Sequence, residues 1–381
     1  MKTFCIFSAN YLPNLGGVER YTYNLAMKLS AMGQRVIIVT SNVFGLDDVG
    51  FADNIKIYRM PCINLLDGRF PVLKINSKYI GLKKKLYTEN IDYVLVNTRF
   101  YTHSLFGLRF AKKIRAKTIV VEHGSSHFTI GRPIWDSLGH LYEHFITSLL
   151  KRHVKVFYGV SKACNQWLKH FKIEASGVFY NFVDLNEIKR LKEEPVLDFR
   201  KTYDIASDEI IVSYSGRLVQ EKGVMELIKT VLLLKQSGLS VRLFIAGEGS
   251  MRNELEIYDS EKIILLGQIG FSRIIALLDQ TDIFCLPSYA EGFPTSIIEA
   301  AACECFCIAG KQGGAKELIL DDSYGIILDK INLDTISDAI LLAATDAVYR
   351  KDAAKRVKQR VEELFHLDAT AKNIMETFQV M

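Results

Sequence analysis

The sequence predicts an α/β fold with two doubly wound domains, each built around a parallel sheet that helices cover on both faces. The chain has 381 residues, which is more than one ordinary core accommodates. Along both halves, short apolar runs rich in β-branched residues alternate with amphipathic segments. The runs are almost continuously apolar, as is typical of strands buried on both faces of a parallel sheet. Ligands of such sheets bind beyond the carboxyl ends of the strands.

The apolar runs place the strands along the chain. In the first half we expect an amphipathic helix at 17–33 and strands at 3–8, 35–41, 55–60, 93–97, 117–123 and 155–161. In the second half we expect strands at 209–216, 241–247, 263–267, 282–288 and 305–310. The stretch 182–208 is polar and carries Pro195, which marks it as a linker. We therefore divide the chain into an N-terminal domain of residues 1–185 and a C-terminal domain of residues 186–360.

The composition is that of a globular protein, with 49% hydrophobic and 24% charged residues. No stretch of about 18 apolar residues occurs, and the N-terminal apolar run is too short for the core of a signal peptide. We therefore expect a cytosolic chain whose seven cysteines are reduced and buried. The Cys-x-Cys-x-Cys run at 303–307 is expected on one face of a strand rather than at a zinc site, because no histidine lies near it.

Charge is divided unevenly between the halves. Residues 1–186 carry 25 Lys and Arg and 12 Asp and Glu, whereas the remainder carries 23 and 31. The basic half favours a lipid-pyrophosphate acceptor or an anionic membrane surface, to which the chain would attach peripherally on the cytoplasmic face. No RNA-binding motif supports a nucleic-acid partner.

An apolar helical stripe at 134–150 belongs to the same basic half. We expect it to pack in the core, with a membrane-surface helix as the alternative. Its residues are Ile134, Trp135, Leu138, Leu141, Tyr142, Phe145, Ile146, Leu149 and Leu150.

Two strand ends of the first half carry candidate ligand-binding residues. Gly16 and Gly17 precede a helix and leave room for an anionic group at its N-terminus, although a glycine pair is also a common turn device. A lone histidine is usually a structural or surface residue, but His123 ends the strand at 117–123 and precedes Gly124, which makes it a better site candidate than most. The spacing G-x-G-x-x-G is absent here, so a dinucleotide-binding fingerprint is not expected.

In the second half, the segment SGRLVQEKG (215–223) places Arg217 and Lys222 directly after a strand, next to Gly216. Two such cations clamp a diphosphate, the arginine through a fork of donors and the lysine as a point charge. The alternative is a solvated basic loop. The segments AGEG (246–249) and LGQIG (266–270) are further glycine-rich strand ends.

The stretch YAEGFPTSIIEAA (289–301) holds Glu291 and Glu299 on either side of a Gly-Phe-Pro turn. One interpretation is a capping box, in which Ser296 caps a helix and Glu299 bonds back to a backbone N–H. The other is that both carboxylates bind a ligand. An ionised carboxylate accepts hydrogen bonds from vicinal hydroxyl groups, and a helix N-terminus attracts anionic oxygen.

Taken in order, these motifs resemble the GT-B-fold glycosyltransferases of group 1, also called family 4. The matching segments are GGVER (16–20), EHG (122–124), SGRLVQEKG (215–223), AGEG (246–249), LPSYAEGFPTSIIEA (286–300) and GGAKEL (313–318). The resemblance implies two Rossmann-like domains facing each other across a deep cleft, the first for the acceptor and the second for a nucleotide-sugar donor. It also implies that a last helix, at about 361–381, packs back on the N-terminal domain.

The resemblance further implies transfer of a sugar from a nucleotide diphosphate with retention of anomeric configuration. The catalytic groups would be Arg217 and Lys222 on the diphosphate, Glu291 on the donor sugar and His123 near its anomeric carbon. Glu299 would bind the ribose hydroxyls. The rest of the donor site would be Gly16, Gly17, Gly216, Gly247, Glu248, Gly267, Ile269, Gly292, Phe293, Pro294 and Thr295.

We expect no cofactor and no metal at this site. The chain contains no D-x-D triplet, and Arg217 and Lys222 would replace the charge of a divalent ion. For retention we expect a front-face route, in which the leaving phosphate accepts the acceptor's proton, rather than a covalent adduct on a carboxylate.

The resemblance favours a UDP-sugar as donor and a glycan or polyprenyl-diphosphate-linked acceptor, in bacterial surface polysaccharide assembly. Two other functions stay open: a nucleotide-sugar 2-epimerase or hydrolase of the same fold, and a non-catalytic nucleotide-sugar-binding subunit.

Some positions depart from the family pattern. Glu304 and Phe306 stand where Gly and then Pro are frequent, and Phe182 stands where Gly is usual. These departures concern local loop geometry.

Overall fold

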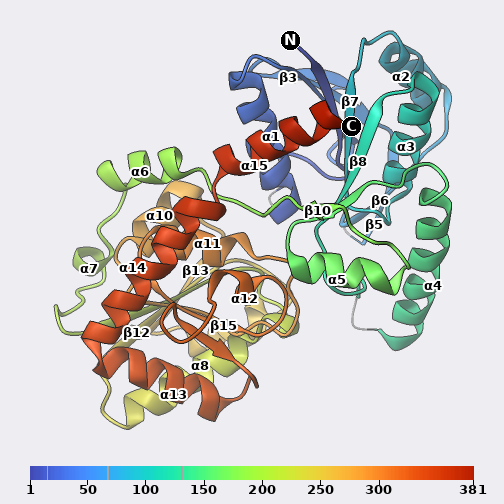
Figure 1. The fold of residues 1–381 in the computed structure, drawn as a ribbon. Coiled ribbons are helices and arrows are strands. Elements are labelled where there is room, and N and C mark those ends of the chain that lie inside the picture. Colours follow the sequence, from blue (N-terminus) through green and yellow to red (C-terminus); the bar gives the residue numbers. More distant parts are fainter. Residues whose placement is uncertain (15, 67, 130–131) are drawn as a thin grey trace. The chain divides into compact units, whose positions relative to one another are not determined.

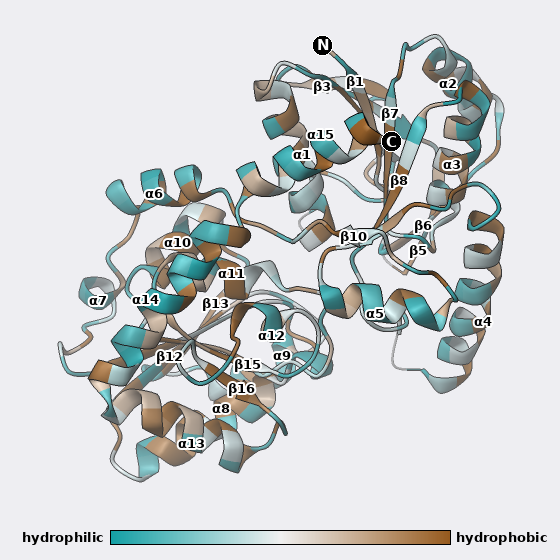
Figure 2. Cartoon of the chain, viewed as in Figure 1, coloured by the Kyte–Doolittle hydropathy of each residue, from teal (hydrophilic) through white to brown (hydrophobic). Residues whose placement is uncertain are grey.

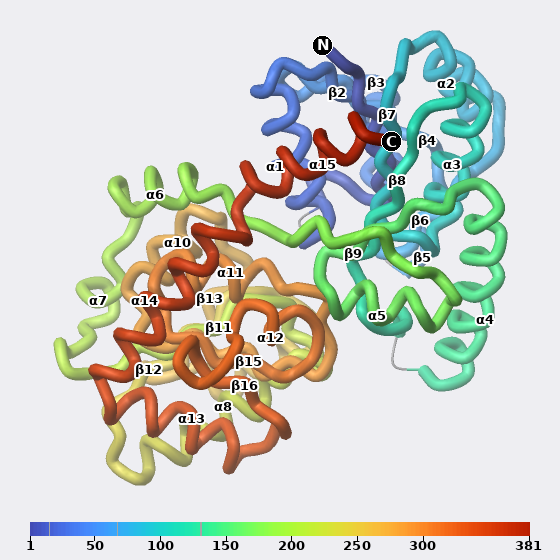
Figure 3. The backbone as a smooth tube through the Cα atoms, in the orientation of Figure 1, coloured from blue at the N-terminus to red at the C-terminus, as the bar shows by residue number. Residues whose placement is uncertain are grey.

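A computed structural model describes residues 1–14, 16–66, 68–129 and 132–381 of the chain. The chain divides into two compact units (Figure 1). Unit 1 comprises Met1–Asn181 and Leu367–Met381, and unit 2 comprises Phe182–His366. Each is an α/β unit with a mainly parallel sheet, so the predicted fold class is confirmed. Figure 3 traces the path of the backbone through both.

The main sheet of unit 1 has the strand order β10-β9-β8-β7-β1-β2-β4-β3, and only the β3–β4 pair is antiparallel. The strands are β1 (Thr3–Phe7), β2 (Arg35–Ser41), β3 (Val49–Ala52), β4 (Ile55–Met60), β7 (Tyr93–Asn97), β8 (Lys117–Glu122), β9 (Phe157–Gly159) and β10 (Gly177–Val178). A separate hairpin pairs β5 (Cys62–Leu65) with β6 (Phe70–Leu73). The helices are α1 (Gly17–Ala31), α2 (Ser77–Tyr87), α3 (Thr102–Ile114), α4 (Pro133–Leu150), α5 (Lys162–His170) and α15 (Leu367–Val380).

The C-terminal helix α15 belongs to unit 1. The Phe378 ring contacts the rings of Phe4 and Tyr93, with centroids 5.6 and 4.8 Å apart. The hydroxyl of Thr370 donates a hydrogen bond to the carbonyl of Tyr180 at 3.0 Å. The helix begins at Leu367, several residues later than the sequence pattern indicates.

Unit 2 has a parallel sheet with the strand order β13-β12-β11-β14-β15-β16. Its strands are β11 (Ile210–Ser215), β12 (Val241–Ala246), β13 (Ile263–Gly267), β14 (Ile283–Leu286), β15 (Phe306–Gly310) and β16 (Ile326–Leu328). Its α-helices are α6 (Leu185–Glu193), α7 (Phe199–Thr202), α8 (Val224–Gln236), α9 (Arg252–Leu255), α10 (Phe271–Leu278), α11 (Thr295–Ala302), α12 (Ala315–Leu318), α13 (Leu333–Thr345) and α14 (Ala347–Leu364). Short 3-10 helices lie at η1 (Gln220–Lys222) and η2 (Glu256–Tyr258).

The central strands carry the core of each unit. Every residue of β1 and of β14 is buried, and Figure 2 shows apolar residues concentrated on the strands. Each expected strand corresponds to an observed one, with small differences at the ends. The strands that the sequence analysis missed are β3, β5, β6, β10 and β16, which have two to four residues each. Such short segments, mostly only half-buried or exposed, lack the apolar run that marks a buried strand.

The cysteine run at 303–307 is only partly strand. Of its three cysteines, Cys307 lies in β15, whereas Cys303 is the C-cap of α11. All three are buried, and the seven cysteines of the described chain are free thiols. The prediction of one strand face is therefore wrong, while the prediction of reduced cysteines agrees with the structure.

Helix α4 departs from the expected core packing. Its apolar residues form two adjacent stripes, and Tyr142, Ile146, Leu149 and Leu150 pack against the core of unit 1. The second stripe is solvent-exposed, with 76% of Ile134, 60% of Trp135 and 68% of Leu141 accessible. Leu138 and Phe145 complete it at 52% and 63%. The prediction of core packing is thus wrong for the outer half of this helix.

Candidate active site

The strand order of unit 2 locates a crevice in its sheet. In chain order β11 is the first strand; β12 and β13 extend the sheet on one side of it, and β14 and β15 extend it on the other. The helices that follow β11 and β14 therefore diverge to opposite faces, and ligands of such sheets bind beyond the carboxyl ends of these two strands. The loop 216–223 follows β11, and the loop 287–294 follows β14.

Backbone packing joins these two loops. Gly223 has φ +66°, and a Cβ atom there would lie 2.0 Å from the carbonyl oxygen of Pro287, so a side chain cannot replace the glycine without a rearrangement. The N–H of Tyr289 donates to the carbonyl of Glu221 at 2.9 Å, and the Ser288 hydroxyl donates to the same carbonyl at 3.2 Å. The loops are therefore held together before any ligand binds.

This packing brings Lys222 to Glu291. The Lys222 Nζ donates to Glu291 Oε1 at 2.5 Å and lies 3.3 Å from the carbonyl oxygen of Ala290. Both side chains are largely buried, at 11% and 13% exposure. An ammonium group has three donors, so one N–H remains after these two contacts. The pair supplies a cation and a carboxylate at the switch point of the sheet.

Arg217 supplies a second cation beside the first. The Tyr214 hydroxyl donates to the carbonyl of Arg217 at 2.8 Å and fixes the backbone there. Burial, followed by the charge of Glu291, raises the pKa of Tyr214, so the hydroxyl stays protonated. The Arg217 side chain is exposed. Within the described part of the chain, its guanidinium forms no hydrogen bond or ion pair.

The stretch 289–301 decides between the two interpretations of its glutamates. Helix α11 begins at Thr295 with Pro294 as N-cap, and no side chain caps it. The capping-box interpretation, with Ser296 as the cap, is therefore wrong. Phe293 is buried and contacts the Phe365 ring at 5.1 Å. The first turn of α11 thus keeps N–H groups that no side-chain cap occupies, at the carboxyl edge of the sheet.

Glu299 lies in the middle of α11 and is buried, with 6% of its surface exposed. A carboxylate is rarely buried to this extent unless it is paired or bound.

A second glycine pair packs against the turn before the helix. The N–H of Gly314 donates to the carbonyl of Gly292 at 2.7 Å, and a Cβ on Gly313 would meet the carbonyl oxygen of Glu291 at 2.2 Å.

The remaining candidates of unit 2 lie at the ends of β12 and β13. A Cβ on Gly247, whose φ is +144°, would lie 1.8 Å from the carbonyl oxygen of Gly216, so only glycine fits this close approach. The N–H of Gly247 donates to the carbonyl of Gly267 at 2.9 Å. Glu248 is exposed and Ile269 is half-buried. These residues form the edge of the crevice next to Gly216.

Unit 1 holds the other candidates. His123 follows β8, and its Nε2 lies 3.0 Å from Asn97 Oδ1, at the end of β7. Because the Asn97 amide donates to Thr22 Oγ1 at 2.8 Å, its oxygen accepts, and we assign the His123 proton to Nε2. Burial lowers the pKa of His123 to about 3. The imidazole is therefore neutral, with its lone pair on Nδ1.

Gly16 and Gly17 begin helix α1. Gly16 is the N-cap without a side-chain cap, and a Cβ there would lie 2.2 Å from a carboxylate oxygen of Glu19. A Cβ on Gly17 would meet open space. A side chain at the first position would have to displace the Glu19 carboxylate, whereas the second glycine leaves room beside the helix end.

Two family models match the chain. Residues 15–187 match the model described as Glycosyltransferase Family 4, and residues 196–360 match the model described as Glycosyl transferases group 1. The chain belongs to the group 1, family 4 glycosyltransferases. The predicted family is therefore confirmed.

Several known proteins resemble this glycosyltransferase over nearly its full length. An uncharacterized glycosyltransferase of Methanocaldococcus jannaschii, MJ1069, is 25% identical over 387 residues, covering 98% of this chain and 97% of that protein. The N-acetylgalactosamine-N,N'-diacetylbacillosaminyl-diphospho-undecaprenol 4-alpha-N-acetylgalactosaminyltransferase of Campylobacter jejuni is 24% identical, over 91% and 92% of the two chains.

Solved structures confirm the GT-B fold of the glycosyltransferase. Sucrose-phosphate synthase of Thermosynechococcus elongatus superposes with a TM-score of 0.77 at 17% identity, covering 100% of this chain and 98% of that one. Anabaena Alr3699/HepE, solved in complex with UDP, superposes with a TM-score of 0.75 at 18% identity over the whole of both chains.

The sequence analysis missed several residues that position the candidate site residues. Tyr214 and Ser288 fix the two loops, and no sequence signal distinguishes them from ordinary strand-end residues. In unit 1, Arg99 is buried between Glu122 and Glu143, with contacts of 2.5 and 2.9 Å. Glu122 in turn accepts the backbone N–H groups at 123 and 124. A charged residue inside an apolar helix stripe, as in LYEHF, was the available signal for Glu143.

Proposed function

We propose that this glycosyltransferase transfers a sugar from a UDP-sugar to a glycan or lipid-linked acceptor, with retention of configuration and without a divalent metal. The observation that carries the proposal is the arrangement at the β11–β14 switch point. There, the exposed Arg217, which has no hydrogen-bond or ion-pair partner among the described residues, lies at the same sheet edge as the Lys222–Glu291 pair and the N-terminus of α11, which no side chain caps. Two cations beside the N-terminus of a helix suit a diphosphate.

The donor would bind with its diphosphate between these groups. Arg217 would contact two phosphate oxygens through its fork, and Lys222 would use its remaining N–H for a third. Glu299 would accept hydrogen bonds from the ribose hydroxyls, and Glu291 from hydroxyls of the sugar. Negative charge grows on the phosphate as the sugar leaves, so fixed cations stabilise the transition state more than the ground state.

In the proposed reaction, the bond between the anomeric carbon and the phosphate oxygen breaks. The electron pair stays on the phosphate, which takes the proton of the attacking acceptor hydroxyl. The new bond forms on the same face of the sugar, which gives retention. His123, neutral with its lone pair on Nδ1, would contact the sugar by hydrogen bonding rather than as a cation.

UDP is the nucleotide that the comparisons support best, because the Anabaena neighbour was solved with UDP and with UDP-glucose. A lipid-linked acceptor is supported by the Campylobacter relative, whose name includes a diphospho-undecaprenol. A role in surface polysaccharide assembly is consistent with a capsular polysaccharide biosynthesis glycosyltransferase of Staphylococcus aureus among the relatives.

We further propose that unit 1 lies on an anionic membrane surface. No helix in the described ranges is long and apolar enough to cross a bilayer. The outer stripe of α4, however, exposes Trp135 at 60% and Phe145 at 63%, and residues 1–186 carry a net charge of +13. An exposed apolar stripe on a basic unit favours attachment at the headgroup level.

The transfer proposal is tested by incubating the chain with UDP-sugars and an undecaprenyl-diphosphate-linked acceptor. Nuclear magnetic resonance of the product reports the anomeric configuration, and EDTA tests the metal requirement. We expect a product that retains the anomeric configuration of the donor and that still forms in the presence of EDTA. Donor loss without acceptor would indicate the hydrolase or epimerase instead, and an inverted product would contradict the front-face route.

The membrane proposal is tested by sedimentation with anionic vesicles at low salt. A Trp135→Ser, Phe145→Ser double variant should lose most of its vesicle binding. The matched control is Leu341→Ser, Leu342→Ser, because these residues of α13 are also exposed, at 42% and 48%, but lie in unit 2. Equal binding of the two double variants would show that the α4 stripe does not contact the membrane.

A further inference from the structure

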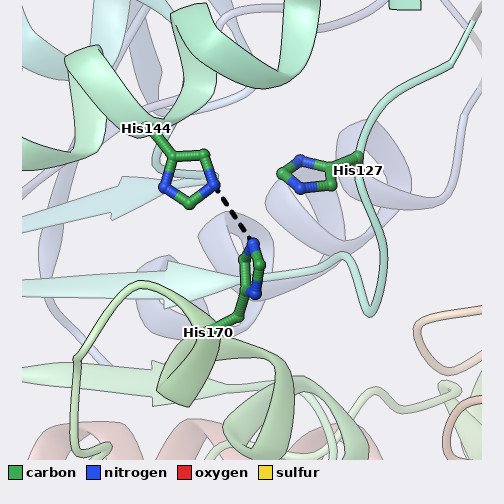
Figure 4. Close-up of side chains that lie close together, drawn as sticks. All are labelled: His127, His144 and His170. Atoms are coloured by element: carbon green, nitrogen blue, oxygen red, sulfur yellow. Dashed lines mark hydrogen bonds between the residues drawn. The ribbon is translucent and has the colours of Figure 1, made fainter. Parts of the chain in front are cut away.

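Three histidines from separate segments of unit 1 converge on one point. His127 lies in the loop after β8, His144 lies on α4 and His170 is the last residue of α5. One ring nitrogen from each lies within 4.8 Å of the others, and Figure 4 shows the three rings gathered around a common point. The transferase site described above uses none of them.

The spacing of the ring nitrogens suits a shared metal ion. His144 Nε2 and His170 Nε2 are 3.1 Å apart. Two imidazole nitrogens bound to one tetrahedral zinc ion, each at about 2.0–2.1 Å, are separated by roughly 3.3 Å. The ligand nitrogens therefore need only a small adjustment of exposed side chains to surround an ion. His144 and His170 are exposed, which leaves a path for the ion and a position for water.

The surroundings of His127 are those of a metal ligand. Its Nδ1 lies 3.2 Å from the buried carboxylate of Glu143, which would accept a hydrogen bond from Nδ1–H and leave the Nε2 lone pair for an ion. Carboxylate–histidine pairs of this kind orient the ligands of many metal sites. The His140 ring stacks on His127 at 4.0 Å and supports its orientation.

We propose that His127, His144 and His170 bind a zinc ion through three imidazole nitrogens, with water as the fourth ligand. Imidazole nitrogen ligands favour zinc over magnesium or calcium, which prefer oxygen ligands. The ion would tie the loop after β8 to α4 and α5. Through Glu143, Arg99 and Glu122, the same contacts reach the backbone N–H of His123. None of the three ligands takes part in the sugar transfer proposed above.

The experiment uses the full chain without a histidine tag, stripped with EDTA. Equilibrium dialysis against micromolar ZnCl₂ with a competing chelator, followed by elemental analysis, measures bound zinc. We expect one zinc per chain. His144→Ala and His170→Ala should each weaken binding at least tenfold, whereas His153→Ala, in the same unit but outside the cluster, should not. Both substituted residues are exposed, so circular dichroism should show folded variants.

Two further readouts separate a built site from a surface histidine. Cobalt should give the visible band of a tetrahedral site in the wild type and in His153→Ala, and lose it in the two ligand variants. Zinc should raise the unfolding temperature of the wild type and of His153→Ala, but not that of the two ligand variants. Less than one zinc per chain in the wild type, or equal affinity in all four proteins, would overturn the proposal. UDP binding, measured in parallel, should be unchanged in every variant, so this outcome is independent of the transferase assignment.

Discussion

Replacement of Lys222 by alanine tests the diphosphate clamp and its structural support together. In the free protein the Lys222 ammonium bonds Glu291 at 2.5 Å, and 9% of the residue is exposed. Alanine removes the cation and leaves the Glu291 carboxylate without this partner. The same change removes one of the two cations that we assign to the diphosphate.

The structure sets the size of both effects. Breaking a fully buried pair by removing one partner costs about 3–5 kcal/mol. Because both side chains keep some solvent contact, we expect a loss of about 2 kcal/mol in the free energy of unfolding. For a unit of this size that lowers the unfolding temperature by about 4–8 °C. A charge-assisted hydrogen bond to phosphate contributes about 1.5–3 kcal/mol, so UDP affinity should fall on the order of 10- to 100-fold.

Differential scanning calorimetry and isothermal titration with UDP measure the two effects. Lys222→Arg keeps the charge and should retain most of the affinity. Lys229→Ala removes an exposed lysine of α8 and should change neither quantity. If Lys222→Ala lowered the unfolding temperature while UDP affinity stayed within twofold of the wild type, Lys222 would only support Glu291, and the clamp would be wrong.

Three further predictions concern the backbone and two ionisable groups. Gly247→Ala should abolish UDP binding, because the new Cβ would lie 1.8 Å from the carbonyl oxygen of Gly216. The control is Gly81→Ala, whose Cβ would have no atom within 4 Å and which should leave the UDP affinity measured by titration unchanged. Glu89 is half-buried, and although desolvation raises its pKa, the bonds to Lys56, Tyr58 and Arg35 outweigh this and lower the pKa to about 2. The ionised Glu89 therefore stabilises the fold above about pH 5, and this stabilisation is lost as the pH falls toward 2. In urea unfolding, Glu89→Gln should lower the free energy of unfolding by up to about 3 kcal/mol near pH 7 and by almost nothing at pH 2. The ring resonances of His123, assigned with His123→Ala, should not titrate between pH 8 and 5, because its pKa is about 3; a midpoint near 6.5 would contradict the neutral tautomer.

The fold was predictable because the central strands are buried on both faces. Segments such as TFCIF and IFCL have no exposed position, so their composition alone distinguishes them from amphipathic helices. Short edge strands such as β10 and β16 bury less surface and leave no comparable pattern. The start of α15 also escaped the prediction, since α14 and α15 are separated only by Phe365 and His366.

The candidate site was predictable as a set of residue types but not as a geometry. Lys222 and Glu291 lie 69 positions apart, and their contact depends on the packing of Gly223 against Pro287. Nothing in the local sequence encodes that packing. The capping box failed for a local reason, since the helix begins one residue before Ser296 and Pro294 takes the cap position.

One departure from the family pattern has a physical explanation. Glu304 stands where the family often has glycine, and its φ is +66°, a left-handed conformation that favours glycine. The Glu304 carboxylate bonds Lys358 at 3.0 Å, which ties this turn to α14. The fold therefore keeps the backbone conformation although the side chain has changed.

The most direct test of the nucleotide-sugar assignment is ligand-observed nuclear magnetic resonance with UDP-, GDP-, ADP- and dTDP-sugars. The measurement is repeated with Glu299→Gln, and with Glu261→Gln as the control, because Glu261 is an exposed glutamate of the same unit. We predict that UDP-sugars bind and that Glu299→Gln alone weakens them at least tenfold. Binding of no nucleotide by the folded wild-type chain, or equal binding by both variants, would contradict the assignment of the donor to this site.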